Sequence, residues 1–183
     1  TAIVFAEISQ SKTDRCIPLV CGVDLAGKEA SFDPALFADL FQPLHYHFIK
    51  ITIHAGETES SQNIWEALYK LHARRIGHGL NLYQNPKMIE YLRDFHISLE
   101  MCPVSNDQVG HFRDFSQPSF GKHENTYRLL DYLNQGVGVT INTDNRLISN
   151  TTLTREYMLA IETFGFNADE VKVKTKGEYE RGR

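Results

Sequence analysis

The sequence predicts an α/β fold: a (β/α) barrel of the TIM type that is incomplete, with about five βα units. Short apolar runs rich in β-branched residues recur along the 183 residues, and segments with helical spacing separate them. Reactive polar side chains stand near the carboxyl ends of the runs. Strands buried on both faces and followed by helices are typical of a parallel sheet. Five units are too few to close an eight-stranded barrel of about 250 residues.

Five segments have the composition of buried strands, being short, apolar and bounded by polar or turn-forming residues. They are residues 17–23, 48–53, 75–78, 97–101 and 137–141. The glycine within 75–78 makes that strand the weakest of the five, because glycine has no side chain to pack.

Helical periodicity fills the intervals between these strands. Two apolar stripes at helical spacing are Ile64, Leu68 and Leu71, and Met88, Ile89 and Leu92. Asn85 followed by Pro86 predicts a helix start with an N-cap and a proline at the first helical position. Asn167 and Glu170 resemble a capping box at the start of a later helix.

The composition fits one compact domain. Hydrophobic residues make up 42% of the chain and aromatic residues 11%, which is enough to bury a core. We expect this domain to span residues 1–170. The segment 171–183 is charged and has no apolar face, so we expect a disordered tail there.

Charge and hydropathy argue against several classes of partner. The formal net charge is −4, and no basic stripe is present to hold a phosphate backbone or a membrane surface. No apolar run reaches the roughly 18 to 20 residues that a membrane span needs. We therefore expect no nucleic-acid partner, no membrane partner and a cytoplasmic location. Cys16, Cys21 and Cys102 form no CxxC pair, which argues against a disulfide framework or a thiolate zinc site.

Reactive side chains recur at one end of successive predicted strands. In chain order they are Asp24, His54, Glu57, His78, Glu100, Ser105, Asp144 and Asn145. The carboxyl ends of parallel barrel strands converge on one face, so residues far apart in the sequence can meet there. A lone histidine near a strand end is more often a hydrogen-bonded core residue, but repetition at the same end of several strands indicates an active site.

The segment His54-Ala-Gly-Glu57 has residue types that suit metal-assisted hydrolysis. Imidazole and carboxylate groups suit Zn²⁺, and Asp144 is the obvious carboxylate partner of His54. Glu57 could act as an acid, and Gly56 allows a sharp turn before it. His78 stands between two glycines, which leaves room for a substrate beside its ring.

Five motifs, in this order, resemble those of adenosine deaminases. They are Asp24-Leu-Ala-Gly27, His54-Ala-Gly-Glu57, Arg75-Ile-Gly-His78-Gly79, Leu99-Glu-Met-Cys102-Pro103 and Asn142-Thr-Asp144, within residues 17–165. Five separated motifs are far more specific than any one of them. The resemblance implies a zinc-dependent hydrolase barrel in which water attacks C6 of adenosine or deoxyadenosine, giving inosine (or deoxyinosine) and ammonia.

The resemblance also implies a role for each matching residue. His54 and Asp144 would be ligands of one Zn²⁺ ion, and Asp144 would also accept a proton from the attacking water. Glu57 would protonate the purine N1. His78 would orient and stabilise the attacking hydroxide.

Two further residues would hold the purine nucleoside, the expected small-molecule partner. The backbone amide of Gly27 would bind N3, and Asn145 would face N7. The family more often has two successive aspartates where this chain has Asp144 and Asn145. An asparagine amide can still donate to N7.

The family's first strand carries a His-x-His pair that completes the zinc site, and this chain begins after that point. We therefore expect the N-terminal barrel strands and two zinc ligands to be missing, which leaves the activity of this chain alone an open question. The segment His45-Tyr46-His47 is not expected to replace them, because it precedes a strand and so lies at the opposite rim of the barrel.

Two alternatives remain. One is a deaminase of adenine or an adenine nucleotide, since one fold hosts many reactions. The other is a noncatalytic fragment whose exposed sheet edges associate with the missing N-terminal half or with a second copy. The H-x-E and P-C-x-x-C signature of the base-editing deaminases is absent, as are the G-x-S-x-G and P-loop motifs.

Overall fold

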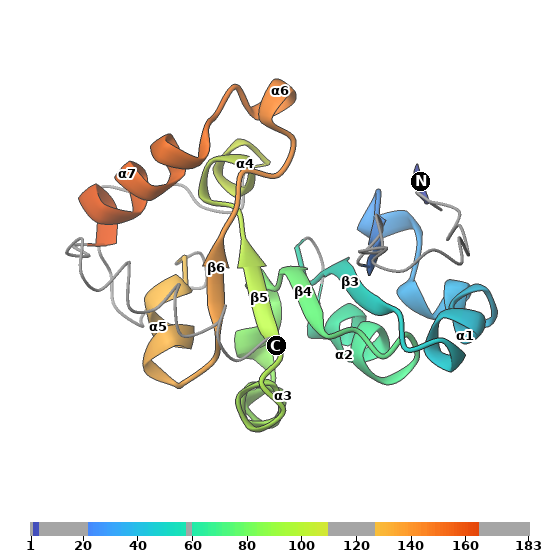
Figure 1. The fold of residues 1–183 in the computed structure, drawn as a ribbon. Coiled ribbons are helices and arrows are strands. Elements are labelled where there is room, and N and C mark those ends of the chain that lie inside the picture. The colour runs from blue at the N-terminus through green and yellow to red at the C-terminus, as the bar shows by residue number, and fades with distance from the viewer. Residues whose placement is uncertain (1, 4–21, 58–59, 110–126, 165–183) are drawn as a thin grey trace, which may run out of the picture.

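A computed structural model describes residues 2–3, 22–57, 60–109 and 127–164. Its strands form one sheet in the order β1-β2-β3-β4-β5-β6 (Figure 1). Their bounds are β1 Ala2–Ile3, β2 Gly22–Ala26, β3 Lys50–Ala55, β4 Arg75–His78, β5 Ser98–Met101 and β6 Val139–Ile141. Strands that follow one another in the chain are therefore neighbours in the sheet, as in a barrel.

Strands β2 to β6 are parallel, and helices separate each from the next. This confirms the predicted fold class, part of a (β/α) barrel. Strand β1 differs, because it pairs with β2 in the antiparallel sense, with Ala2 opposite Ala26. A two-residue strand has no periodicity, so the sequence did not predict it.

The helices fall in the intervals between the strands. Their bounds are α1 Ala38–Tyr46, α2 Ser61–Tyr69, α3 Pro86–Asp94, α4 Pro103–Gln108, α5 Leu129–Asn134, α6 Arg146–Ser149 and α7 Leu153–Phe164. Figure 1 shows α4 and α6 beyond the carboxyl ends of β5 and β6. The predicted helix start is confirmed, since the Asn85 side chain accepts a hydrogen bond from the Met88 amide at 3.2 Å.

The two faces of the sheet differ in polarity. In β3, Ile51, Ile53 and Ala55 are buried in an apolar core with residues of α2 and α3, such as Ile64 and Leu92. Successive side chains of a strand point to opposite faces, so Thr52 and His54 lie on the other face. The strands β2 and β5 alternate in the same way. One face therefore holds the fold together, and the opposite face carries the polar residues.

This alternation corrects two expectations about strand ends. Asp24 and His54 were expected to follow strands, but they lie within β2 and β3. A strand with one polar face continues past its last run of apolar residues. Conversely, Phe48 has φ of 54°, outside the range of strand residues, so β3 begins later than predicted, at Lys50. Strand β5 begins one residue later than predicted, at Ser98.

Several predictions lie outside the described residues. They are most of the strand at 17–23, the capping pair Asn167 and Glu170, and the tail at 171–183. The single domain over residues 1–170 stays a prediction. In the part of the chain that the structure describes, no helix combines the length and apolar character needed to cross a membrane.

Candidate active site

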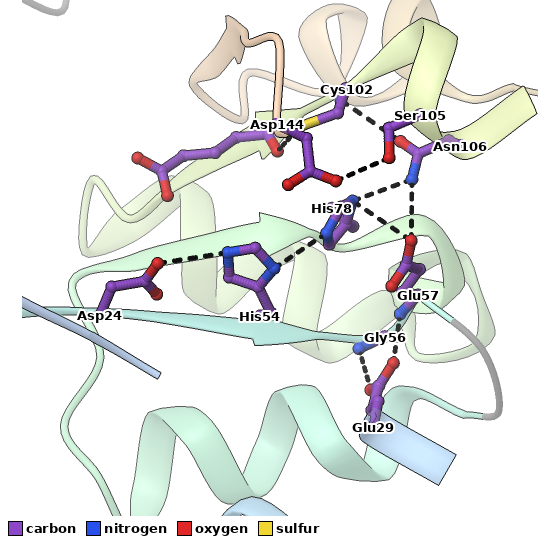
Figure 2. Close-up of polar contacts among 11 residues, drawn as sticks. Asp24, Glu29, His54, Gly56, Glu57, His78, Cys102, Ser105, Asn106 and Asp144 are labelled. Atoms are coloured by element: carbon purple, nitrogen blue, oxygen red, sulfur yellow. Dashed lines mark hydrogen bonds and ion pairs between the residues drawn. The ribbon is translucent and has the colours of Figure 1, made fainter. Parts of the chain in front are cut away.

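The polar residues of β2 to β6 meet at the carboxyl ends of the strands (Figure 2). Register places His54 of β3 beside Gly77 of β4, and Gly77 beside Glu100 of β5. A Cβ atom at Gly77 would lie 3.0 Å from Cδ2 of the His54 ring and 3.1 Å from its Cγ. The absence of a side chain at Gly77 therefore gives the His54 ring its space.

His54 and His78 form the centre of the cluster. Their rings meet edge to face at 4.9 Å between centroids, and Nδ1 of His54 lies 3.1 Å from Nε2 of His78. On its other side, Nε2 of His54 lies 3.3 Å from the Asp24 carboxylate. Burial lowers the pKa of His54, but the hydrogen bond to Asp24 and the charges of Asp24, Asp144 and Glu57 outweigh it, so the pKa is raised above 6.5.

His78 is in a different environment. Its side chain is 1% exposed, and its Nδ1 lies 2.8 Å from Nδ2 of Asn106 and 3.7 Å from Oε1 of Glu57. Burial and the neighbouring charge of His54 lower the pKa of His78 to about 4, so the ring is neutral at physiological pH. Its backbone is left-handed, with φ of 65°, which is uncommon for a residue other than glycine and often occurs at functional sites.

Glu57 follows β3 and is held through its backbone. The carboxylate of buried Glu29 accepts hydrogen bonds from the amides of Gly56 at 2.5 Å and Glu57 at 2.8 Å, and from Nδ2 of Asn63 at 3.0 Å. Gly56 has φ of 71°, which confirms the expected sharp turn. The half-buried Glu57 side chain points toward Asn106 and His78 (Figure 2).

Asp144 follows β6 and is exposed. Its Oδ2 accepts a hydrogen bond from the Ser105 hydroxyl at 2.6 Å, and its backbone is left-handed with φ of 53°. The next residue, Asn145, begins α6 as its N-cap, with Oδ1 accepting from the Leu147 and Ile148 amides. The cap uses only Oδ1, so the Nδ2 donor takes no part in it.

The structure thus brings together four of the predicted residues, His54, Glu57, His78 and Asp144. The other two predicted residues, Gly27 and Asn145, border this region in the chain but make none of the described hydrogen bonds within the cluster.

Glu100 is held from two sides. Its carboxylate accepts from Thr52 at 2.5 Å and pairs with Arg75 at 2.6 Å, across three neighbouring strands. Sequence reasoning noted Glu100 only as a polar residue near a strand end. The contacts show that it supports the polar face of the sheet below His54 and His78.

Two residues of the cluster were missed by sequence reasoning. Glu29 begins a short 3-10 helix, Glu29–Ser31, after β2, and Asn106 lies in α4, where it is completely buried. Both belong to polar stretches that resemble solvent-facing surface in the sequence. The available signal for Asn106 was its position in a helix that begins with Pro103 directly after a strand, since such helix starts face the active-site end of a barrel.

The described residues fit part of a zinc site. His54 and Asp144 supply donor atoms that zinc prefers, but zinc sites in proteins use three or more protein ligands. Within the described ranges, no group of three or more His, Cys, Asp or Glu side chains is arranged to hold a metal ion. His45 forms a hydrogen bond to the Leu71 carbonyl, and its ring contacts that of His72 at a tilt of 58°. It lies before the amino end of β3, so it is not a further ligand.

Comparison with known sequences identifies relatives of the chain. The family described as Adenosine deaminase matches residues 5–178. An adenosine deaminase of Clostridium acetobutylicum is 40% identical over 153 residues, which are 84% of this chain and 43% of the relative. One from Enterococcus faecalis is 38% identical over 157 residues, 86% of this chain and 44% of the relative. The chain therefore spans less than half the length of these relatives.

Solved structures share the fold. An adenine deaminase from Arthrobacter aurescens superposes with a TM-score of 0.71 at 23% identity, over 84% of this chain and 44% of that one. A Burkholderia ambifaria amidohydrolase with bound Zn superposes with a TM-score of 0.70 at 19% identity, over 86% of this chain and 42% of that one. Arabidopsis ADAL complexed with IMP superposes with a TM-score of 0.67 at 26% identity, over 83% of this chain and 41% of that one.

The match of the family to residues 5–178, together with the parallel sheet and the polar cluster at its carboxyl end, establishes that this chain belongs to the adenosine deaminase family.

Proposed function

We propose that the protein carrying this chain converts adenosine or deoxyadenosine and water into inosine or deoxyinosine and ammonia. The observation that supports this most strongly is the placement of Glu57 and His78 within 3.7 Å of each other at the strand ends. The relatives named adenosine deaminase, which are 38% and 40% identical, add independent support.

Glu57 is the general acid of the proposal. Attack of water on C6 pushes electrons onto the purine ring, and a proton delivered to N1 prevents an anion from forming there. General acid help of this kind is worth a factor of about 10² to 10⁴ in rate. The Glu29 carboxylate fixes the Glu57 backbone, so the acid is positioned before the substrate arrives.

His78 and Asp144 act on the water. A neutral imidazole can hold the attacking oxygen by a hydrogen bond without repelling a cation, and the lowered pKa of His78, to about 4, keeps it neutral. Asp144 accepts the proton that the water loses. The Ser105 hydroxyl, 2.6 Å from Oδ2, orients the Asp144 carboxylate for this transfer.

His54 and Asp144 are the zinc ligands of the proposal within this chain. Zinc, when bound, lowers the pKa of water from about 15.7 to about 7 and so makes hydroxide available at neutral pH. The remaining ligands are not among the described residues. The support from this chain is the donor chemistry of an imidazole and a carboxylate at the carboxyl ends of two strands.

Substrate binding uses Gly27 and Asn145. The Gly27 amide donates to N3 and the Asn145 Nδ2 group donates to N7. The N-cap of α6 holds the Asn145 side chain in place through Oδ1, which leaves its donor group for the purine. A cytoplasmic location and association with an N-terminal half of the barrel belong to the same proposal.

A second substrate class has specific support. Arabidopsis ADAL was solved with IMP, and an Arabidopsis N6-methyl-AMP deaminase is 27% identical over 85% of this chain. An adenine nucleotide is therefore the main rival to adenosine. The chain is more similar to the adenosine deaminases, at 40% identity.

The test uses the full-length protein loaded with zinc and a panel of adenosine, deoxyadenosine, adenine, AMP and N6-methyl-AMP. Ammonia release and the loss of absorbance near the adenine maximum give kcat/KM for each compound. We expect adenosine or deoxyadenosine to give the highest value. A higher kcat/KM for AMP or adenine would replace the proposed substrate, and no turnover of any compound would refute the deaminase proposal.

A further inference from the structure

Asn106 is a completely buried polar residue at the centre of the site. It lies in α4, and its side chain points between His78 and Glu57 (Figure 2). Its amide has three neighbours: the Cys102 backbone amide at 3.3 Å, Nδ1 of His78 at 2.8 Å and Oε1 of Glu57 at 3.4 Å. A buried amide satisfied on both of its ends is held in one orientation.

The Cys102 contact decides which end of the amide faces which way. A backbone N–H can only donate, so the atom facing Cys102 must be the oxygen Oδ1. Flipping the amide would place two donors together at Cys102. The nitrogen Nδ2 therefore faces Glu57 and His78.

The orientation of the amide determines where the His78 ring carries its hydrogen. Because Asn106 Nδ2 donates to Nδ1, that ring nitrogen must accept, and the hydrogen of the neutral ring lies on Nε2. The Nε2–H group lies on the side of the ring that faces His54, whose Nδ1 is 3.1 Å away, and it is the donor that the proposed function uses for the attacking oxygen.

We propose that Asn106 is a positioning residue that fixes His78 in its Nε2–H tautomer and holds the Glu57 carboxylate beside that ring. This role deepens the proposed deaminase function and rests on it for its catalytic consequence. The tautomer itself follows from the hydrogen bonds and does not depend on which substrate is used.

The first measurement reads the tautomer directly. Full-length, zinc-loaded protein labelled with ¹⁵N-histidine is studied by long-range ¹H–¹⁵N correlation, with the His78 signals assigned by their loss in the His78→Gln variant. Protonated and unprotonated ring nitrogens have well-separated shifts, so the pattern distinguishes the two tautomers. We expect the hydrogen of His78 on Nε2. A hydrogen on Nδ1 in the unmodified protein would overturn the proposal, and this result needs no variant of Asn106.

The second measurement compares three variants. Asn106→Asp has nearly the same shape but replaces the donor with an acceptor, so we expect the His78 hydrogen to move to Nδ1. Asn106→Ala removes the donor without adding charge, so we expect a mixture of tautomers. Asn85→Asp is the matched control, because it makes the same substitution at the N-cap of α3, where only the side-chain oxygen is used. The control should keep the His78 signals unchanged. Unchanged His78 signals in Asn106→Asp would contradict the inference.

Kinetics supply the third measurement. For Asn106→Asp and Asn106→Ala we expect kcat to fall by about tenfold or more, with a smaller change in KM, since a misplaced acid or hydrogen bond donor affects the chemical step more than binding. A changed tautomer with unchanged kcat would overturn the positioning role. If the unmodified protein deaminates none of the purines, the proposed function fails, while the NMR result still decides the tautomer.

Discussion

The two halves of the polar cluster are built differently. At the ends of β3, β4 and β5, His78 and Asn106 are buried, Glu57 is half-buried, and hydrogen bonds connect the three side chains. At the end of β6, Asp144 and Asn145 are exposed, and the described hydrogen bond to the Asp144 carboxylate comes from Ser105. The first half is fixed by this chain alone.

This difference separates two kinds of chemistry. Acid–base groups need a fixed tautomer and a fixed distance, and buried hydrogen bonds provide both. Metal ligands acquire their geometry from the ion and from the full ligand set. We infer that the acid–base half of the site is preformed and that the metal half is completed by the remaining ligands. Four predictions test this contrast, in order of decreasing effect.

Glu57→Gln should give the largest effect. The amide cannot deliver a proton to N1, so we expect kcat to fall by a factor of about 10² to 10⁴. Bound zinc, measured by metal analysis after dialysis, should stay the same because Glu57 is not a proposed ligand. Glu90→Gln, on the exposed surface of α3, is the control, and its kcat and bound zinc should both stay unchanged. Near-normal turnover in Glu57→Gln would remove the acid role.

Glu29→Gln tests whether the preformed half depends on its support. Both carboxylate oxygens accept described hydrogen bonds, and a glutamine has a single acceptor oxygen, so the donors on the other side lose their partner. We expect unfolding free energy to fall by about 1 to 3 kcal/mol and kcat to fall by about tenfold, as for loss of an orienting contact. Chemical denaturation and steady-state kinetics measure the two. Reduced stability with unchanged kcat would leave Glu29 a purely structural role.

Ser105→Ala tests the metal half. Removing the hydroxyl frees the Asp144 carboxylate, and loss of a group that orients a metal ligand typically weakens metal binding by about 10 to 100-fold. Because Asp144 is exposed, water can replace the lost hydrogen bond, and we expect stability to change by less than about 1 kcal/mol. Competition with a chelator of known affinity measures the zinc affinity. Unaltered zinc affinity would argue against Asp144 as a ligand oriented by Ser105.

Glu156→Gln should give the smallest effect, visible only as a function of pH. Glu156 of α7 accepts from the Val104 amide of α4 at 3.0 Å, and burial raises the pKa of its carboxyl above 4.5. The folded protein then binds this proton more tightly than the unfolded chain does. Stability should therefore fall as pH rises from about 4.5 through the raised pKa, and Glu156→Gln should remove that fall. Denaturation curves measured from pH 4 to 8 give the unfolding free energy at each pH. The same dependence of unfolding free energy on pH in both proteins would contradict the prediction.

The sequence was sufficient to predict the fold because burial patterns determine it. The runs at 48–53, 75–78, 97–101 and 137–141 each overlap a described strand, and the order of strands and helices follows the prediction. The boundaries were less accurate. The left-handed residue Phe48 delays the start of β3, and no apolar pattern reveals a positive φ.

The candidate site was predictable only where reactive residues follow apolar runs. His54, Glu57 and His78 satisfied that condition, and the structure places them together. Glu29 and Asn106 did not, because a buried polar residue and a surface polar residue have the same letter in a sequence. Their importance comes from partners 27 to 49 positions away, which only the folded chain brings within reach.

Gly77 has no reactive atom, yet the His54 ring occupies the space beside it. A methyl group would press on the His54 ring at 3.0 Å and so displace the contact between the two imidazoles without removing any functional side chain. In a saturation screen for loss of function, this position should therefore be as intolerant as the reactive residues themselves. Natural variants that change it would be expected to yield folded, inactive protein.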